Sequence, residues 1–232
     1  MAYIFIIVML LSLYVATLLM MGRMKNTRVV NGIFFITIFS LYIIYVVQVL
    51  LIQGASSIYF HGVLASANIS PFMFSILPLI YFSRGKMQKH LYLLVSLLSV
   101  GMILSPVMNA ITYAVNEYPF NILSLMDYIA HLLLSLWGVY LVKSNQVCLK
   151  KRDCVFSALI IIAVALAMLI LNLIFDTTFF GLSLTGRHNI YGNVLVDNSY
   201  LSASIYFSGL SVILLAGYVY SSCFAKNKNE QT

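Results

Sequence analysis

The sequence predicts an all-α, polytopic membrane protein with seven transmembrane helices, its N-terminus outside and its C-terminus inside. The first observation is composition, since 62% of the 232 residues are hydrophobic and only 8% are charged. About a quarter of the residues are charged in ordinary soluble domains. Disorder is also excluded, because it requires low hydrophobicity together with high net charge. The other two observations are the number of long apolar segments and the distribution of positive charge.

Seven segments are long and apolar enough to cross a bilayer. A spanning helix needs about 20 apolar residues, because the hydrocarbon core is roughly 30 Å thick and each helical residue rises about 1.5 Å. Helices are expected because backbone polar groups in lipid must be paired within their own segment. The segments form a single domain, 1–232, and lie near residues 2–21, 29–52, 63–82, 91–115, 122–142, 154–175 and 201–224.

Three of these regions carry features that need separate interpretation. The segment 2–21 has no positive residues before its apolar run, which favours a retained helix over a cleaved signal peptide. Pro71 and Pro78 in the third segment and Pro106 in the fourth remove backbone donors, so kinks are expected there. The long connection 176–200 is expected to lack secondary structure of its own, which is typical of a functional lid or re-entrant cap.

Positive charge alternates along the chain. Every Lys and Arg except Arg187 follows the first, third, fifth or seventh segment, so the positive-inside rule places those loops in the cytoplasm. Cys148, Cys154 and Cys223 flank these loops and lack CxxC spacing, so we expect free cytoplasmic thiols and no metal or cofactor site. The net charge of +7 forms no basic face wide enough for a phosphate backbone, so nucleic acid is not an expected partner.

Polar residues within the apolar segments are the strongest candidates for a functional site, because they are costly in a bilayer. Six of them fall in the predicted outer half of the third to sixth segments: Asn68, Asn109, Asp127, His131, Asn172 and Asp176. We therefore infer a polar cavity open to the outer leaflet, lined by these four helices and covered by the 176–200 connection; hydrogen bonds that only hold helices together are the alternative. The candidates are Ser66, Asn68, Ser70, Asn109, Asp127, His131, Asn172 and Asp176.

Asp127 and His131 are four residues apart, so they project from one face of a helix and can touch. A carboxylate beside an imidazole can orient the ring and stabilise its protonated form, as a general base or a proton relay requires. The alternative is that Asp127 is hydrated near the surface and that His131 donates a hydrogen bond to a neighbouring helix.

Several short motifs resemble those of the YwaF-like integral membrane proteins of bacteria, a family that includes an animal transmembrane acyltransferase. The motifs YPFN at 118–121, YIAHL at 128–132 and VYLV at 139–142 are similar to the family's fifth helix. The runs LSPVMN at 104–109 and NIS at 68–70 resemble its fourth and third helices. The resemblance covers roughly residues 60–215 and implies seven helices in the bacterial plasma membrane.

The resemblance also bears on catalysis. In the acyltransferase member, a cysteine on the third helix would accept the acyl group and a histidine on the fifth would act as base. His131 falls at the position of that histidine, whereas the position of the cysteine is occupied by Ala67. The predicted topology places all three cysteines of this chain on the opposite side of the membrane.

Three functions follow as hypotheses. The leading one is a lipid- or amphiphile-binding protein, with membrane lipids and a membrane protein as partners. The alternative is a phospholipid acyltransferase or hydrolase with His131 as base, Asp127 as its orienting partner, and Ser66, Ser70 or water as nucleophile. The third hypothesis is transport of a small solute or proton. It ranks lowest because such a path would have to continue inward, and the fifth helix beyond His131 has Ser135 as its single small polar residue.

Overall fold

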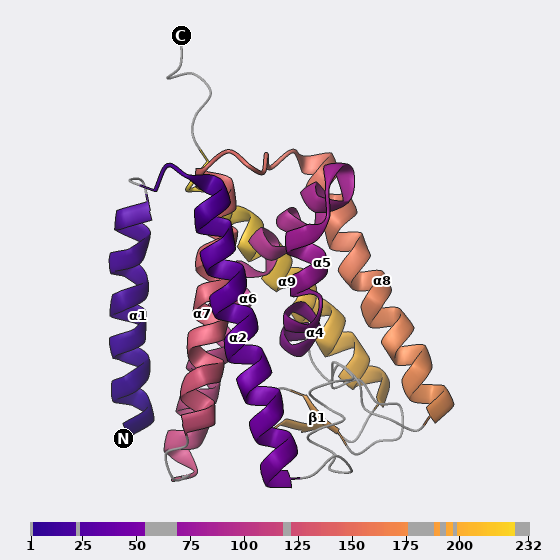
Figure 1. Cartoon of the computed structure of the whole chain (residues 1–232). Coiled ribbons are helices and arrows are strands. Elements are labelled where there is room, and N and C mark those ends of the chain that lie inside the picture. The colour runs from indigo at the N-terminus through magenta and orange to yellow at the C-terminus, as the bar shows by residue number, and fades with distance from the viewer. Residues whose placement is uncertain are drawn as a thin grey trace.

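A computed structural model describes residues 2–21, 24–53, 69–117, 122–175, 188–190, 194–196 and 199–225. In these ranges the chain forms eight helices and one two-stranded sheet (Figure 1). The long helices run roughly side by side. The ends of α1 (Ala2–Met20), α5 (Leu77–Phe82), α7 (Ile122–Lys143) and α9 (Ser199–Ser222) lie on the same side of the bundle as the starts of α2 (Thr27–Gln53), α6 (Gly85–Val115) and α8 (Lys151–Phe175).

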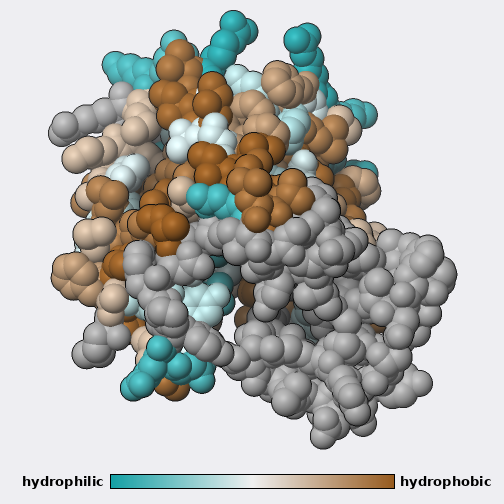
Figure 2. Space-filling model, turned by 60° about the horizontal axis from the view of Figure 1, so that its bottom comes forward, coloured by the Kyte–Doolittle hydropathy of each residue, from teal (hydrophilic) through white to brown (hydrophobic). Residues whose placement is uncertain are grey.

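Five helices, α1, α2, α6, α7 and α8, are long and apolar enough to cross a membrane, and α9 contains a shorter apolar stretch, Tyr206–Ser222. Their outward faces carry large apolar side chains such as Phe5, Leu19 and Leu51, each more than 70% exposed. Figure 2 shows apolar residues across most of the coloured surface, with hydrophilic residues gathered toward its upper and lower edges. An apolar surface of this extent suits lipid as the surrounding solvent. The architecture is that of a multi-pass helical membrane protein.

The third apolar segment is interrupted, as its prolines predict. Within the described residues it forms α4 (Ile69–Ser75) and α5, with a break at Ile76. Pro78 lies in the first turn of α5, where its missing N–H would have no helical partner in any case. Pro106 has a different outcome, because α6 continues through it as one helix of 31 residues.

A short hairpin lies in the connection that was expected to have no secondary structure. Strands β1 (His188–Ile190) and β2 (Val194–Val196) pair antiparallel, with Asn189 opposite Leu195. The valines of β2 are β-branched and favour extended structure, a signal too short to find by periodicity. The parts of this connection at 176–187, 191–193 and 197–198 lie outside the described residues.

Helix α6 is the centre of the bundle and packs against α7, α9, α8 and α1. Two glycines let neighbouring backbones approach it closely. A Cβ atom on Gly138 of α7 would lie 2.8 Å from the carbonyl oxygen of Val95, and one on Gly217 of α9 would lie 1.7 Å from that of Leu97. Small residues at helix crossings are the usual means of close packing in membranes.

Serine hydroxyl groups support the same three-helix junction. Ser96 of α6 donates a hydrogen bond to the carbonyl of Gly138 at 2.9 Å, and Ser221 of α9 donates one to the carbonyl of Ser96 at 3.0 Å. Both serines are fully buried. The junction therefore pairs its buried hydroxyl groups with backbone carbonyls, which avoids the cost of unpaired polar groups in an apolar interior.

Candidate functional site

Asp127 and His131 meet near the N-terminal end of α7. The imidazole Nδ1 of His131 lies 2.8 Å from the backbone carbonyl oxygen of Asp127 and 3.2 Å from its carboxylate Oδ1. The predicted contact on one helix face is therefore present. The backbone carbonyl oxygen and the carboxylate Oδ1 of Asp127 can only accept a hydrogen bond from the ring, so Nδ1 carries the proton in this arrangement.

The imidazole of His131 is enclosed, whereas the carboxylate of Asp127 is partly open. The His131 side chain is 4% exposed and that of Asp127 is 27% exposed. Phe74 of α4 packs edge-on against the imidazole, with ring centroids 5.2 Å apart. The second ring nitrogen, Nε2, is buried without a hydrogen-bond partner among the described residues. Such a group in a native interior is costly and calls for an explanation.

A pocket opens beside this pair, between α2, α4 and α7. Its volume is about 60 Å³, which is enough to hold water or a small polar group. Three aromatic rings and one carboxylate dominate its wall. The described lining residues are Leu41, Tyr42 and Tyr45 of α2, Phe74 of α4, and Met126, Asp127 and Ala130 of α7.

This pocket differs from the cavity that the sequence predicted. That cavity was expected to be polar and lined by the third to sixth segments, but the pocket is largely apolar and uses the second, third and fifth. Tyr42 and Tyr45 are the contributions that sequence reasoning missed. Aromatic residues inside an apolar helix are indistinguishable in sequence from ordinary packing residues, so no pattern could have singled them out.

The other candidates lie elsewhere or outside the described residues. Asn109 is a half-buried residue of α6 and does not line the pocket, and Ser70 is half-buried on α4. Asn172 belongs to α8, although its side chain is not among those described. The remaining three, Ser66, Asn68 and Asp176, fall in undescribed parts of the chain.

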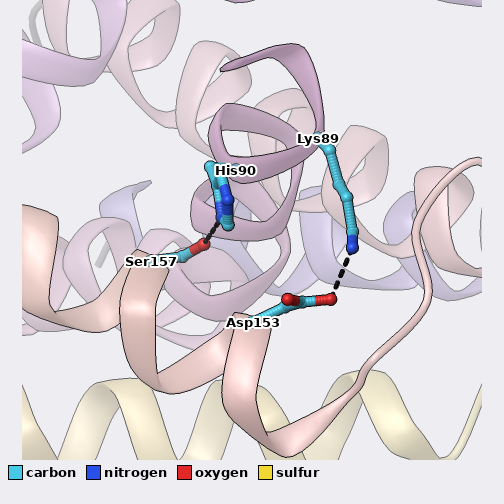
Figure 3. A network of polar contacts seen from close by, with 4 residues as sticks. All are labelled: Lys89, His90, Asp153 and Ser157. Atoms are coloured by element: carbon cyan, nitrogen blue, oxygen red, sulfur yellow. Dashed lines mark hydrogen bonds and ion pairs between the residues drawn. The ribbon is translucent and has the colours of Figure 1, made fainter. Parts of the chain in front are cut away.

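A second polar cluster joins α6 to α8 at the opposite end of the bundle (Figure 3). Lys89 forms an ion pair with Asp153, and the imidazole Nδ1 of His90 lies 3.1 Å from the hydroxyl of Ser157. The Lys89 side chain is 40% exposed, so this contact is close to the protein surface. It fastens one end of α8 and forms no enclosed site.

A third cluster is buried and connects α2 to α7. The Asn31 carbonyl accepts a hydrogen bond from the indole N–H of Trp137 at 3.1 Å, and its amide donates one to Gln146 at 2.6 Å. Trp137 is fully buried and Asn31 is 6% exposed. The polar groups of this cluster are paired with one another, as in ordinary hydrogen bonding between helices. The Asp127 pocket is therefore the stronger candidate for function.

Comparison of the chain with known protein families, with curated proteins and with solved structures finds no match. The resemblance to the YwaF-like proteins therefore stays a prediction from short motifs.

Proposed function

We propose that this chain is a seven-crossing membrane protein whose Asp127 pocket binds the head of a lipid or another amphiphile. The carrying observation is a small, mostly aromatic pocket with a partly exposed carboxylate in its wall. Pockets of this kind bind small molecules through apolar contact area and use a few polar groups to fix orientation. The apolar side chains of Leu41 and Met126, which also line the pocket, offer contact for the first part of an alkyl chain.

The seven crossings and their orientation are part of the proposal. Five long apolar helices, the apolar stretch of α9 and the interrupted α4–α5 segment supply the seven. Lys86, Lys89, Lys143 and Lys151 all lie at the helix ends that share one side of the bundle (Figure 1). By the positive-inside rule this side is cytoplasmic, so the Asp127 pocket belongs to the outer half.

The binding proposal is tested by filling the pocket. Ala130 lines it, and Ala130→Leu would occupy part of its volume, whereas Ala163→Leu adds the same atoms to an exposed position of α8. Each purified variant is placed in lipid nanodiscs with a single-chain amphiphile that carries a small uncharged or ammonium head and a photoreactive group next to that head. We expect pocket peptides to be labelled in the unmodified protein and in Ala163→Leu, and labelling to fall several-fold in Ala130→Leu. Equal labelling of the two variants would refute the proposal.

A second candidate function is acyl transfer or hydrolysis with His131 as general base. The observation in its favour is the orientation of the imidazole, with Nδ1 held by Asp127 and Nε2 left without a described partner. Among the described residues no hydroxyl or thiol hydrogen-bonds to Nε2, so an activated nucleophile lacks support. Unchanged phospholipid turnover in His131→Ala would eliminate this function.

A further inference from the structure

We infer that the Asp127 pocket selects a positively charged head group, an ammonium on a long apolar chain, over zwitterionic, neutral or anionic heads. The inference rests on the proposed function and names the ligand class of the same pocket. Three features of the described lining residues support it: their charge, their aromatic rings and the volume that they enclose.

The charge of the wall favours a cation. Asp127 is the charged residue among the described lining residues, and none of them is a Lys, Arg or His. A phosphate or carboxylate head would meet the Asp127 carboxylate with no Lys, Arg or His among the described lining residues to offset the repulsion, and an anion left unpaired in an apolar site is strongly disfavoured. An ammonium head would instead donate a charge-assisted hydrogen bond to that carboxylate.

One oxygen of the Asp127 carboxylate can accept a hydrogen bond from a ligand. His131 Nδ1 lies 3.2 Å from Oδ1, so Oδ2 is the oxygen that no contact among the described residues occupies. The side chain remains 27% exposed, which lets a ligand reach it from the pocket. The contact with His131 also limits the rotation of the Asp127 side chain and thereby holds the acceptor in place.

The aromatic rings add a second attraction for the same charge. Tyr42, Tyr45 and Phe74 line the pocket, and the rings of Tyr42 and Phe74 are 5.7 Å apart and tilted by 37°. The face of an aromatic ring attracts a cation within about 6 Å, by roughly 0.5–2 kcal/mol depending on desolvation. A carboxylate combined with several aromatic rings is a recognition pattern for ammonium groups. Neither the carboxylate nor the ring faces attract an anion.

The volume limits the size of the head. About 60 Å³ matches a small ammonium group more closely than a phosphocholine or a sugar. The chain of the ligand must then leave the pocket and lie against the apolar outer surface of the bundle. A single-chain amine satisfies the charge, the rings and the volume together.

The test uses three photoreactive probes with one common sixteen-carbon chain, ending in a primary amine, an alcohol or a phosphate. The full-length protein is kept in nanodiscs of uncharged lipid, and labelling of the pocket peptides is measured by mass spectrometry. We expect the amine to label the pocket roughly ten-fold more than the alcohol and the phosphate least of all. Equal labelling by amine and alcohol would overturn the inference.

Asp127→Asn removes the charge and keeps the shape of the side chain. We expect it to lower amine labelling roughly ten-fold and to leave alcohol labelling unchanged. Asp153→Asn is the matched control, since Asp153 pairs with Lys89 far along the chain from the pocket residues; its labelling should equal that of the unmodified protein. Undiminished amine labelling in Asp127→Asn would also overturn the inference.

The rings are tested at Tyr45. Tyr45→Phe retains an aromatic face and should retain amine labelling, whereas Tyr45→Leu should lose it several-fold. If all three probes label the pocket equally and Ala130→Leu still abolishes labelling, the charge selection fails while the proposed function stands. If no probe labels the pocket at all, both fail.

Discussion

Replacing Gly217 by Ala should destabilise the bundle more than any other small change in its interior that we consider. Its added Cβ would lie 1.7 Å from the carbonyl oxygen of Leu97 and 2.6 Å from the carbonyl carbon. These are backbone atoms in the middle of α6, so no side-chain rotation can relieve the overlap. Helix α9 must move away by about 1.7 Å before ordinary contact at 3.4 Å is restored.

The magnitude follows from the contacts that this movement disrupts. Overpacking of an interior costs about 1–3 kcal/mol. The hydrogen bond from Ser221 to the carbonyl of Ser96, one turn further along α9, would also be lost, and interhelical hydrogen bonds in membranes are worth about 0.6 kcal/mol each. We therefore expect a loss of roughly 2–4 kcal/mol, equivalent to a fall of about 4–16 °C in melting temperature for a chain of this size.

The assay is thermal unfolding of the purified protein in detergent, followed with a thiol-reactive dye. Cys154 is a free thiol that is only 6% exposed, so its reaction reports unfolding once the exposed Cys148 and Cys223 have been replaced by serine in every variant. Gly32→Ala is the matched control, because its Cβ would meet only the Tyr81 hydroxyl, at 3.4 Å. A melting temperature of Gly217→Ala equal to that of Gly32→Ala would refute the reasoning.

Three further predictions use other parts of the fold. Asn31→Ala leaves the buried indole N–H of Trp137 unpaired, so stability should fall by about 1–3 kcal/mol and emission of this single tryptophan should shift; unchanged emission would contradict the geometry. Lys89→Ala removes a partly exposed ion pair with Asp153, so the free energy of unfolding should fall by less than about 1 kcal/mol, and by less still in high salt. A larger loss that does not depend on salt would contradict the exposed position of this pair. Cys148 is exposed, and a membrane-impermeant maleimide should label it in inverted vesicles but not in intact cells; labelling of intact cells would reverse the proposed orientation.

The helical elements were largely predictable from the sequence. Apolar length located α2 and α7 within about two residues of their observed ends, because a bilayer requires a minimum length of paired backbone. The break before Pro78 followed from its missing N–H. The start of α6 at Gly85 rather than near residue 91 was missed, since polar and charged residues can extend a helix beyond the hydrocarbon.

The candidate site was predictable only in part. The contact between Asp127 and His131 follows from spacing along one helix. The aromatic wall does not, because Tyr45 is brought to Asp127 by the packing of α2 on α7, and Phe74 by the packing of α4 on α2 and its ring contact with His131. Asn109, which shares a predicted depth with Asp127, does not line the pocket, since depth in a bilayer specifies one coordinate and leaves the direction of a side chain open.

By itself, the sequence determined that this chain is a multi-pass helical membrane protein and which residues of a helix share a face, because solvent and helical periodicity act locally along the chain. Only the tertiary structure decided which faces meet. Gly217 against Leu97 and Tyr45 beside Asp127 are contacts between helices far apart in sequence. Such contacts depend on shape complementarity between whole helix surfaces, which no local pattern of apolar and polar residues encodes.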